Sequence, residues 1–203
     1  LIGAIAAGNC MVLKSSEFAP ATALVMKKIV TESFSPDYVL YTEGDGAQVV
    51  PGMMNRFRFV HVFYTGSTGT GRIIYKMAAE QLIPVTLELG GKSPAIVEND
   101  ANIAVAARRI AVTKFSNAGQ MCVAPDYVLV HTSAKEKMVK SLIESIGSFY
   151  TGANGDYNYG KIINEKQFNR LTGMLKQGKI VFGGKHDISK LYIEPTIMEN
   201  VPL

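Results

Sequence analysis

One of the two cysteines in this sequence is a candidate nucleophile. Cys122 ends the segment N-A-G-Q-M-C, a polar turn that contains a glycine and follows a long apolar helical pattern. A thiol becomes an effective nucleophile as a thiolate, which a nearby positive charge, helix dipole or backbone N–H favours. Most cysteines are instead small buried hydrophobic residues. Cys10 lies in a short apolar run and fits that description, so we expect Cys10 to be buried and Cys122 to carry chemistry.

A single acidic residue, Glu88, follows the apolar run 84–87 and precedes two glycines. A carboxylate at the end of an apolar strand is costly to bury without a partner. Two interpretations stay open for it. Glu88 either forms a salt bridge with Lys92, or it lies at the floor of a cleft and activates water as a general base.

The sequence G-S-T-G-T-G, from Gly66 to Gly71, follows an apolar run and precedes a helical pattern. The first turn of a helix offers unpaired N–H groups and the positive end of the helix dipole. Glycines let a phosphate approach the backbone, and Ser67 adds a hydroxyl donor. The turn therefore fits a dinucleotide pyrophosphate, although it is neither the G-x-G-x-x-G pattern nor a Walker motif with its lysine. The alternative is a turn that only caps a helix.

Lys14 and Glu17 follow the first apolar run. Ligands of parallel sheets bind at the carboxyl ends of the strands, where an acidic residue can accept hydrogen bonds from a ribose hydroxyl. We expect this pair to contact a nucleotide ribose. The alternative is a solvated Lys-x-x-Glu pair at a helix start, where the helix dipole favours the carboxylate.

Short apolar runs alternate with helical patterns along the chain, which is typical of βαβ units around a parallel sheet. We predict strands at 10–13, 38–41, 59–64, 84–87, 95–97, 127–130, 179–182 and 191–193. We predict helices at 1–7, 20–31, 72–81, 102–117, 133–148 and 164–176. The fold class is thus α/β: a Rossmann-like cofactor region with a parallel sheet, followed by an α/β catalytic region, with the boundary near the glycines of 88–93.

Composition excludes several classes of protein. The chain has 203 residues, of which 47% are hydrophobic and 19% charged, so it can form a large core. The net charge is +4, but the basic residues are scattered among acidic ones, which argues against nucleic-acid binding. No apolar stretch approaches the roughly 18 residues of a membrane span. The three histidines show no metal-ligand spacing, so we expect no metal.

Four segments together resemble the aldehyde dehydrogenase superfamily. The stretch from Ala6 to Glu17 is similar to its A-x-G-N-x(4)-K-P-S-E segment, and the Gly66 turn to its G-S-T-x-x-G turn. L-E-L-G-G-K-S-P, which contains Glu88, and G-Q-M-C, which ends at Cys122, match its glutamate and nucleophile signatures in order and spacing. The residues after Cys122, V-A-P-D-Y, resemble the class 3 and fatty aldehyde branch.

The resemblance implies roles for these residues. Cys122 and Glu88 would be catalytic, and Lys14, Glu17, Gly66, Ser67 and Gly71 would bind the cofactor. That cofactor would be NAD, with NADP possible, because Glu17 repels a 2′-phosphate while Lys14 partly offsets the repulsion. Residues 1–90 would be the later part of an NAD-binding domain and residues 91–203 the earlier part of a catalytic domain.

The sequence also departs from the family pattern. Ser15 stands where the family usually has proline, which should loosen the turn before Glu17. An upstream W-N-x-P-type segment and a downstream E-x-F-G-P segment are absent, and family subunits are more than twice this length. The resemblance therefore implies an internal fragment with little dehydrogenase activity by itself.

The predicted reaction is NAD(P)-dependent oxidation of an aliphatic or aromatic aldehyde to a carboxylic acid. It would proceed through a cysteine thiohemiacetal and thioester, in a cytoplasmic homo-oligomer. The alternatives are a non-catalytic nucleotide-binding fragment and a CoA-acylating aldehyde dehydrogenase. Glu88 argues against CoA acylation, because such enzymes need no deacylating base. A scaffold domain would leave the spacing of Glu88 and Cys122 as coincidence.

Overall fold

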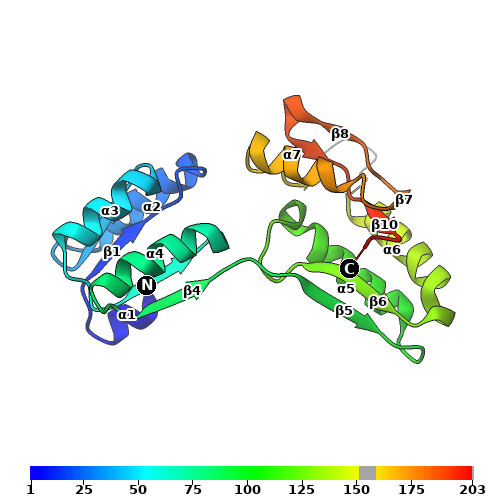
Figure 1. The fold of residues 1–203 in the computed structure, drawn as a ribbon, viewed down its shortest axis with the longest axis horizontal. Coiled ribbons are helices and arrows are strands. Elements are labelled where there is room, and N and C mark those ends of the chain that lie inside the picture. The colour runs from blue at the N-terminus through cyan, green and yellow to red at the C-terminus, as the bar shows by residue number, and fades with distance from the viewer. Residues whose placement is uncertain (151–158, 203) are drawn as a thin grey trace. The chain divides into compact units, whose positions relative to one another are not determined.

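A computed structural model describes residues 1–150 and 159–202. The chain divides into two compact units, 1–88 and 89–203. Parallel strand pairs together with helices occur in both units, two pairs in the first and one among the described residues of the second (Figure 1). The predicted α/β fold class is confirmed. Among the described residues, no helix is both long and apolar enough to cross a membrane.

The first unit consists of two strand–helix–strand crossovers. Its strands are β1 (Met11–Lys14), β2 (Val39–Thr42), β3 (Val62–Thr65) and β4 (Val85–Glu88). Its helices are α1 (Ile2–Ala6), α2 (Pro20–Ser33), α3 (Gly46–Arg56) and α4 (Thr68–Glu80). β1 pairs in parallel with β2, and β3 with β4, so α2 and α4 are the crossover helices. A small core of Met54, Ala78 and Ile83 joins α3 to α4 and to the turn before β4.

Helix α3 was not predicted, and the third strand was predicted too early. Gly46, Pro51 and Gly52 all disfavour a helix interior, so local propensity gives no signal for α3. Tertiary packing overrides that propensity, because Met54 on α3 is 4% exposed and lies in the core. Residues 59–61 approach the sheet without joining it, and β3 begins only at Val62.

The second unit continues the alternation and ends in short antiparallel pairs. Its strands are β5 (Ser93–Val97), β6 (Pro125–Val130), β7 (Lys179–Phe182), β8 (His186–Asp187), β9 (Tyr192–Ile193) and β10 (Ile197–Glu199). Its α-helices are α5 (Ile103–Phe115), α6 (Lys135–Tyr150) and α7 (Glu165–Met174), and its 3₁₀ turns are η1 (Ser116–Gly119), η2 (Thr132–Ala134) and η3 (Ile188–Lys190). β5 and β6 are parallel, whereas β7 pairs with β10 and β8 with β9 in antiparallel fashion.

Helices α5 and α6 pack against each other and form the larger core. Ala107 and Ala111 on α5 are fully buried, which lets the helices approach closely. Met138 and Ile146 on α6 are 1% exposed and fill the space opposite. Because α5 is fixed along its length, the turn that follows it starts from a rigid support.

Two local predictions were wrong. The helix predicted from residue 133 begins at Lys135 instead, because η2 precedes it, and the Ser133 hydroxyl lies 2.8 Å from Nδ1 of His131. Cys10 was expected to be buried in a strand, yet it precedes β1 and is exposed. The predicted helix start at residue 164 is confirmed, since the Asn164 side chain caps α7 by accepting a hydrogen bond from the Gln167 N–H at 3.0 Å.

Candidate active site

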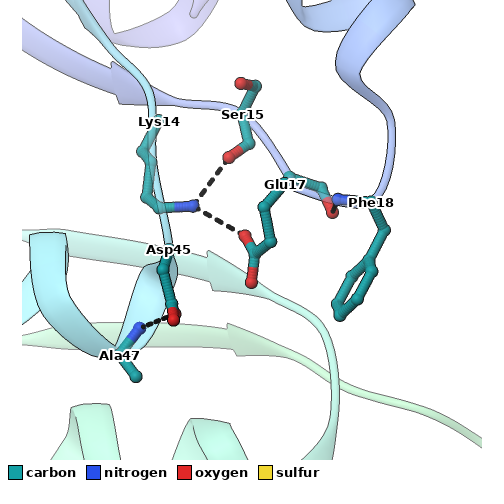
Figure 2. A network of polar contacts seen from close by, with 7 residues as sticks. Lys14, Ser15, Glu17, Phe18, Asp45 and Ala47 are labelled. Atoms are coloured by element: carbon teal, nitrogen blue, oxygen red, sulfur yellow. Dashed lines mark hydrogen bonds and ion pairs between the residues drawn. The ribbon is translucent and has the colours of Figure 1, made fainter. Parts of the chain in front are cut away.

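The predicted ribose-contacting pair lies at the end of β1, where Lys14 is the last strand residue and Glu17 follows in the loop (Figure 2). Lys14 Nζ donates to Glu17 Oε2 at 3.0 Å and to the Ser15 carbonyl at 2.7 Å. Asp45 caps α3 beside this pair, and a Cβ on Gly46 would lie 3.7 Å from Glu17 Oε1 and from Lys14 Nζ. The backbone at the start of α3 therefore closes one side of the pair.

Glu17 is ionised at neutral pH. Its pKa is held below the usual range, first by a hydrogen bond from its own backbone N–H, then by the Lys14 ammonium and by the N–H of Gly46. The carboxylate side chain is 38% exposed, so its oxygens remain accessible. An ionised, accessible carboxylate beside a lysine can accept hydrogen bonds from the hydroxyls of a ribose.

The glycine turn leads from β3 into α4. Ser67 is the N-cap of α4, since its Oγ accepts from the Thr70 N–H at 3.2 Å. The amides of Thr68 and Gly69 lie in the first turn, where a helix provides no acceptor, and a Cβ on Gly69 would meet no atom within 4 Å. Helix α4 is thirteen residues long, and its open N-terminus fits an anionic group. Gly71 instead lies on the buried face of α4, where its lack of a side chain allows close packing.

Glu88 and the glycine turn lie at the same edge of the β3–β4 pair. Thr65 and Glu88 are register partners, and the Gly66 N–H donates to the Glu88 carbonyl at 2.9 Å. The Glu88 side chain is exposed. Parallel pairing therefore brings the candidate base to the end of the sheet that also carries the candidate phosphate-binding turn.

Cys122 is exposed in a turn of unusual backbone conformation. Asn117 and Ala118 are consecutive left-handed residues, with φ of 51° and 54°, and Gly119 follows with φ of 76°. Left-handed conformations cost non-glycine residues roughly 1–2 kcal/mol each. Such strain in a turn that ends at an exposed thiol is typical of a functional site.

The second glycine of the L-E-L-G-G segment contacts the nucleophile turn. A Cβ placed on Gly91 would lie 2.7 Å from the carbonyl oxygen of Cys122, whereas one on Gly90 would meet nothing within 4 Å. Gly91 was not among the site residues predicted from the sequence. The available signal was the match of Gly90 and Gly91 to the glutamate signature L-E-L-G-G-K-S-P.

The predicted alternative partner of Glu88 is engaged elsewhere. Lys92 Nζ donates to Asp126 Oδ2 at 2.9 Å, and Lys114 Nζ lies 3.8 Å from the other oxygen of that carboxylate. Burial lowers the pKa of the Lys114 ammonium, which Asp126 partly opposes. Asp126 thus links α5, the start of β5 and the segment after Cys122. Across residues 1–150 and 159–202, no group of three His, Cys, Asp or Glu side chains could hold a metal ion.

Comparison with known proteins assigns the family. The model of the aldehyde dehydrogenase family matches residues 1–203. The chain belongs to the aldehyde dehydrogenase family, as its signature segments predicted.

Named relatives agree with this assignment. A 4,4'-diaponeurosporen-aldehyde dehydrogenase of Staphylococcus aureus is 47% identical over 99% of this chain and 44% of its own length. Aldehyde dehydrogenase family 3 member A2 of Mus musculus is 41% identical over 99% of this chain and 41% of its length, which confirms the predicted class 3 likeness. A crystal structure of indole-3-acetaldehyde dehydrogenase with NAD+ matches 96% of this chain and 42% of its own, with 30% identity and a TM-score of 0.86. The chain spans less than half the length of these relatives.

Proposed function

We propose that the whole protein oxidises an aldehyde to a carboxylic acid with NAD+, through a thiohemiacetal and then a thioester on Cys122. The main observation that supports this proposal is the close contact of Gly91 with the Cys122 carbonyl. Gly91 follows Glu88 by three residues, so covalent geometry alone keeps their Cα atoms within roughly 11 Å. The segment that follows the candidate base therefore contacts the turn that carries the candidate nucleophile.

Cys122 performs the first step of the proposed reaction. Its thiolate attacks the aldehyde carbon, a C–S bond forms, and the carbonyl π electrons move to the oxygen. The Cys122 backbone N–H can donate to this oxyanion, because a backbone donor placed where charge develops stabilises the transition state. The exposed position of the thiol leaves it open to a substrate.

NAD+, when bound, supplies the acceptor for the hydride that leaves the substrate carbon. Lys14 and Glu17 would hold its adenosine ribose, and the Ser67 hydroxyl with the first-turn amides of α4 would hold its pyrophosphate. Gly66 supports that turn through its bond to β4, and Gly71 through close packing of α4. The anionic Glu17 should disfavour the 2′-phosphate of NADP, so NAD is the preferred cofactor.

Glu88 completes the proposed cycle. Its carboxylate takes a proton from water, the resulting hydroxide attacks the thioester carbon, and the C–S bond breaks to release the carboxylic acid and the Cys122 thiolate. This chemistry requires the carboxylate to reach the thioester through one water molecule. A medium-length aliphatic aldehyde such as hexanal is the first substrate to test.

The test is hexanal-dependent NADH formation by the whole protein. Cys122→Ser should abolish it, because an alcohol has no comparable nucleophilicity at neutral pH. Cys10→Ser is the matched control, and it should leave the rate within about twofold of wild type because it makes no interaction in the proposed mechanism. Undiminished NADH formation by Cys122→Ser would refute the proposal.

A further inference from the structure

The Gln120 carboxamide donates two hydrogen bonds and accepts one. Its Nε2 donates to the carbonyl of Asn117 at 3.0 Å and to that of Lys161 at 2.9 Å. Its Oε1 accepts from the Ile163 N–H at 2.9 Å. All three partners are backbone groups, and two of them belong to a segment about forty residues further along the chain. Gln120 therefore ties the nucleophile turn to a distant part of the same unit.

The distant segment is a firm anchor. Ile162, between the two partners, is 3% exposed, and its N–H donates to the Leu191 carbonyl at 2.8 Å. Gly160 packs against the turn as well, since a Cβ there would lie 3.2 Å from both the carbonyl carbon and Oδ1 of Asn117. The backbone that Gln120 holds is thus fixed to the core through Ile162, which lies between its two partners.

The turn needs such support. Asn117 and Ala118 are both left-handed, and Ala118 has no polar side chain that could satisfy its own backbone. Local energetics would favour relaxation of these two residues. Gln120, two residues before the thiol, donates to the Asn117 carbonyl and so acts directly on the first of these two left-handed residues.

We infer that Gln120 is a positioning residue for Cys122, because its carboxamide holds the strained turn on the 161–163 backbone. The inference rests on the proposed function, in which Cys122 is the nucleophile. The role requires two N–H donors and one acceptor in one plane. Glutamate retains the acceptor and loses both donors, methionine retains the length alone, and asparagine is one methylene too short.

Two measurements on the whole protein test the inference. The first is hydrogen exchange of the Ile163 amide, which reports on the Gln120 bond directly. The second is hexanal protection of Cys122 against iodoacetamide, followed by peptide mass spectrometry with Cys10 as the internal reference. Gln120→Met should lose about tenfold in Ile163 amide protection and about tenfold in hexanal protection of Cys122, the effect of one ordinary hydrogen bond.

Gln120→Glu separates positioning from stability. It should retain protection of the Ile163 amide, because it keeps that acceptor, and still lose the hexanal effect, because it no longer holds the Asn117 carbonyl. Gln177→Met, at an exposed position beyond α7, is the matched control and should change neither readout. Cys10 alkylation should stay constant in all variants.

The possible failures are distinguishable. If hexanal fails to protect wild-type Cys122, the proposed nucleophile is wrong. If hexanal protects Cys122 equally in wild type, Gln120→Met and Gln120→Glu, then Cys122 is the nucleophile and the positioning role of Gln120 is refuted. Should Gln120→Met fail to fold, the comparison of Gln120→Glu with wild type decides the outcome.

Discussion

Replacement of Gly91 by alanine tests how the glutamate segment supports the nucleophile turn. The added Cβ would lie 2.7 Å from the Cys122 carbonyl oxygen, whereas ordinary contacts begin near 3.4 Å. The added Cβ is bonded directly to the backbone, and the Cys122 carbonyl is part of the backbone, so neither group can rotate away. The two segments have to separate by about 0.7 Å to relieve the overlap, which is the kind of shift that overpacking imposes.

The expected loss follows from that displacement. A shift of about 1 Å in a reacting group can cost roughly 100-fold in rate. We therefore expect Gly91→Ala to lower kcat/KM for hexanal about 10- to 100-fold in the whole protein, mainly through kcat. Overpacking should also lower the free energy of unfolding by about 1–3 kcal/mol, measured by urea denaturation.

Gly90→Ala is the matched control. Neither glycine has a positive φ, so both substitutions are compatible with the backbone. A Cβ on Gly90 meets nothing within 4 Å, and the loss of chain entropy in the unfolded state is the same for both variants. Gly90→Ala should keep wild-type kinetics. If Gly91→Ala also stayed within about twofold of Gly90→Ala, the structural support of Cys122 by Gly91 would be disproved.

Two further predictions concern the cofactor and the strained turn. Glu17→Gln should weaken NAD+ binding about tenfold by calorimetry, because a charged acceptor is lost. Since the pKa of Glu17 is lowered, the NAD+ affinity of the wild type should stay constant as pH falls below neutral and decrease only as pH passes through that lowered pKa. An unchanged NAD+ affinity in Glu17→Gln would contradict the role of Glu17. Ala118→Gly should raise the free energy of unfolding, measured by urea denaturation, by up to about 1 kcal/mol, because glycine adopts the left-handed conformation without strain. A lower free energy of unfolding in this variant would show that the turn is unstrained.

Much of the architecture follows from local patterns in the sequence. Pro20, Asn102 and Asn164 mark helix starts that the structure reproduces, and the alternation of apolar runs with helical periodicity gave the α/β class. These signals are local, so they can be read from neighbouring residues. Helix α3 could not be read in this way, because Pro51 and Gly52 disfavour it and only packing of Met54 stabilises it.

The candidate site likewise combines residues that local motifs identify with contacts that only the tertiary structure shows. Motif spacing identified Cys122, Glu88, Ser67 and Glu17 as candidates. Long-range contacts that support them, such as Gln120 with Lys161, leave no periodic trace in the sequence. A glutamine that binds backbone atoms accepts any residue type as its partner, so sequence patterns cannot reveal which segment it reaches.

The central claim is that Cys122 and Glu88 act in sequence on one thioester. Glu88→Gln separates their steps, because it retains the nucleophile and removes the base that hydrolyses the thioester. Incubation of this variant with hexanal and NAD+, followed by peptide mass spectrometry, should show a hexanoyl group accumulating on Cys122 together with a single burst of NADH. Steady turnover at the wild-type rate, or NADH formation with Cys122 never acylated, would contradict the account.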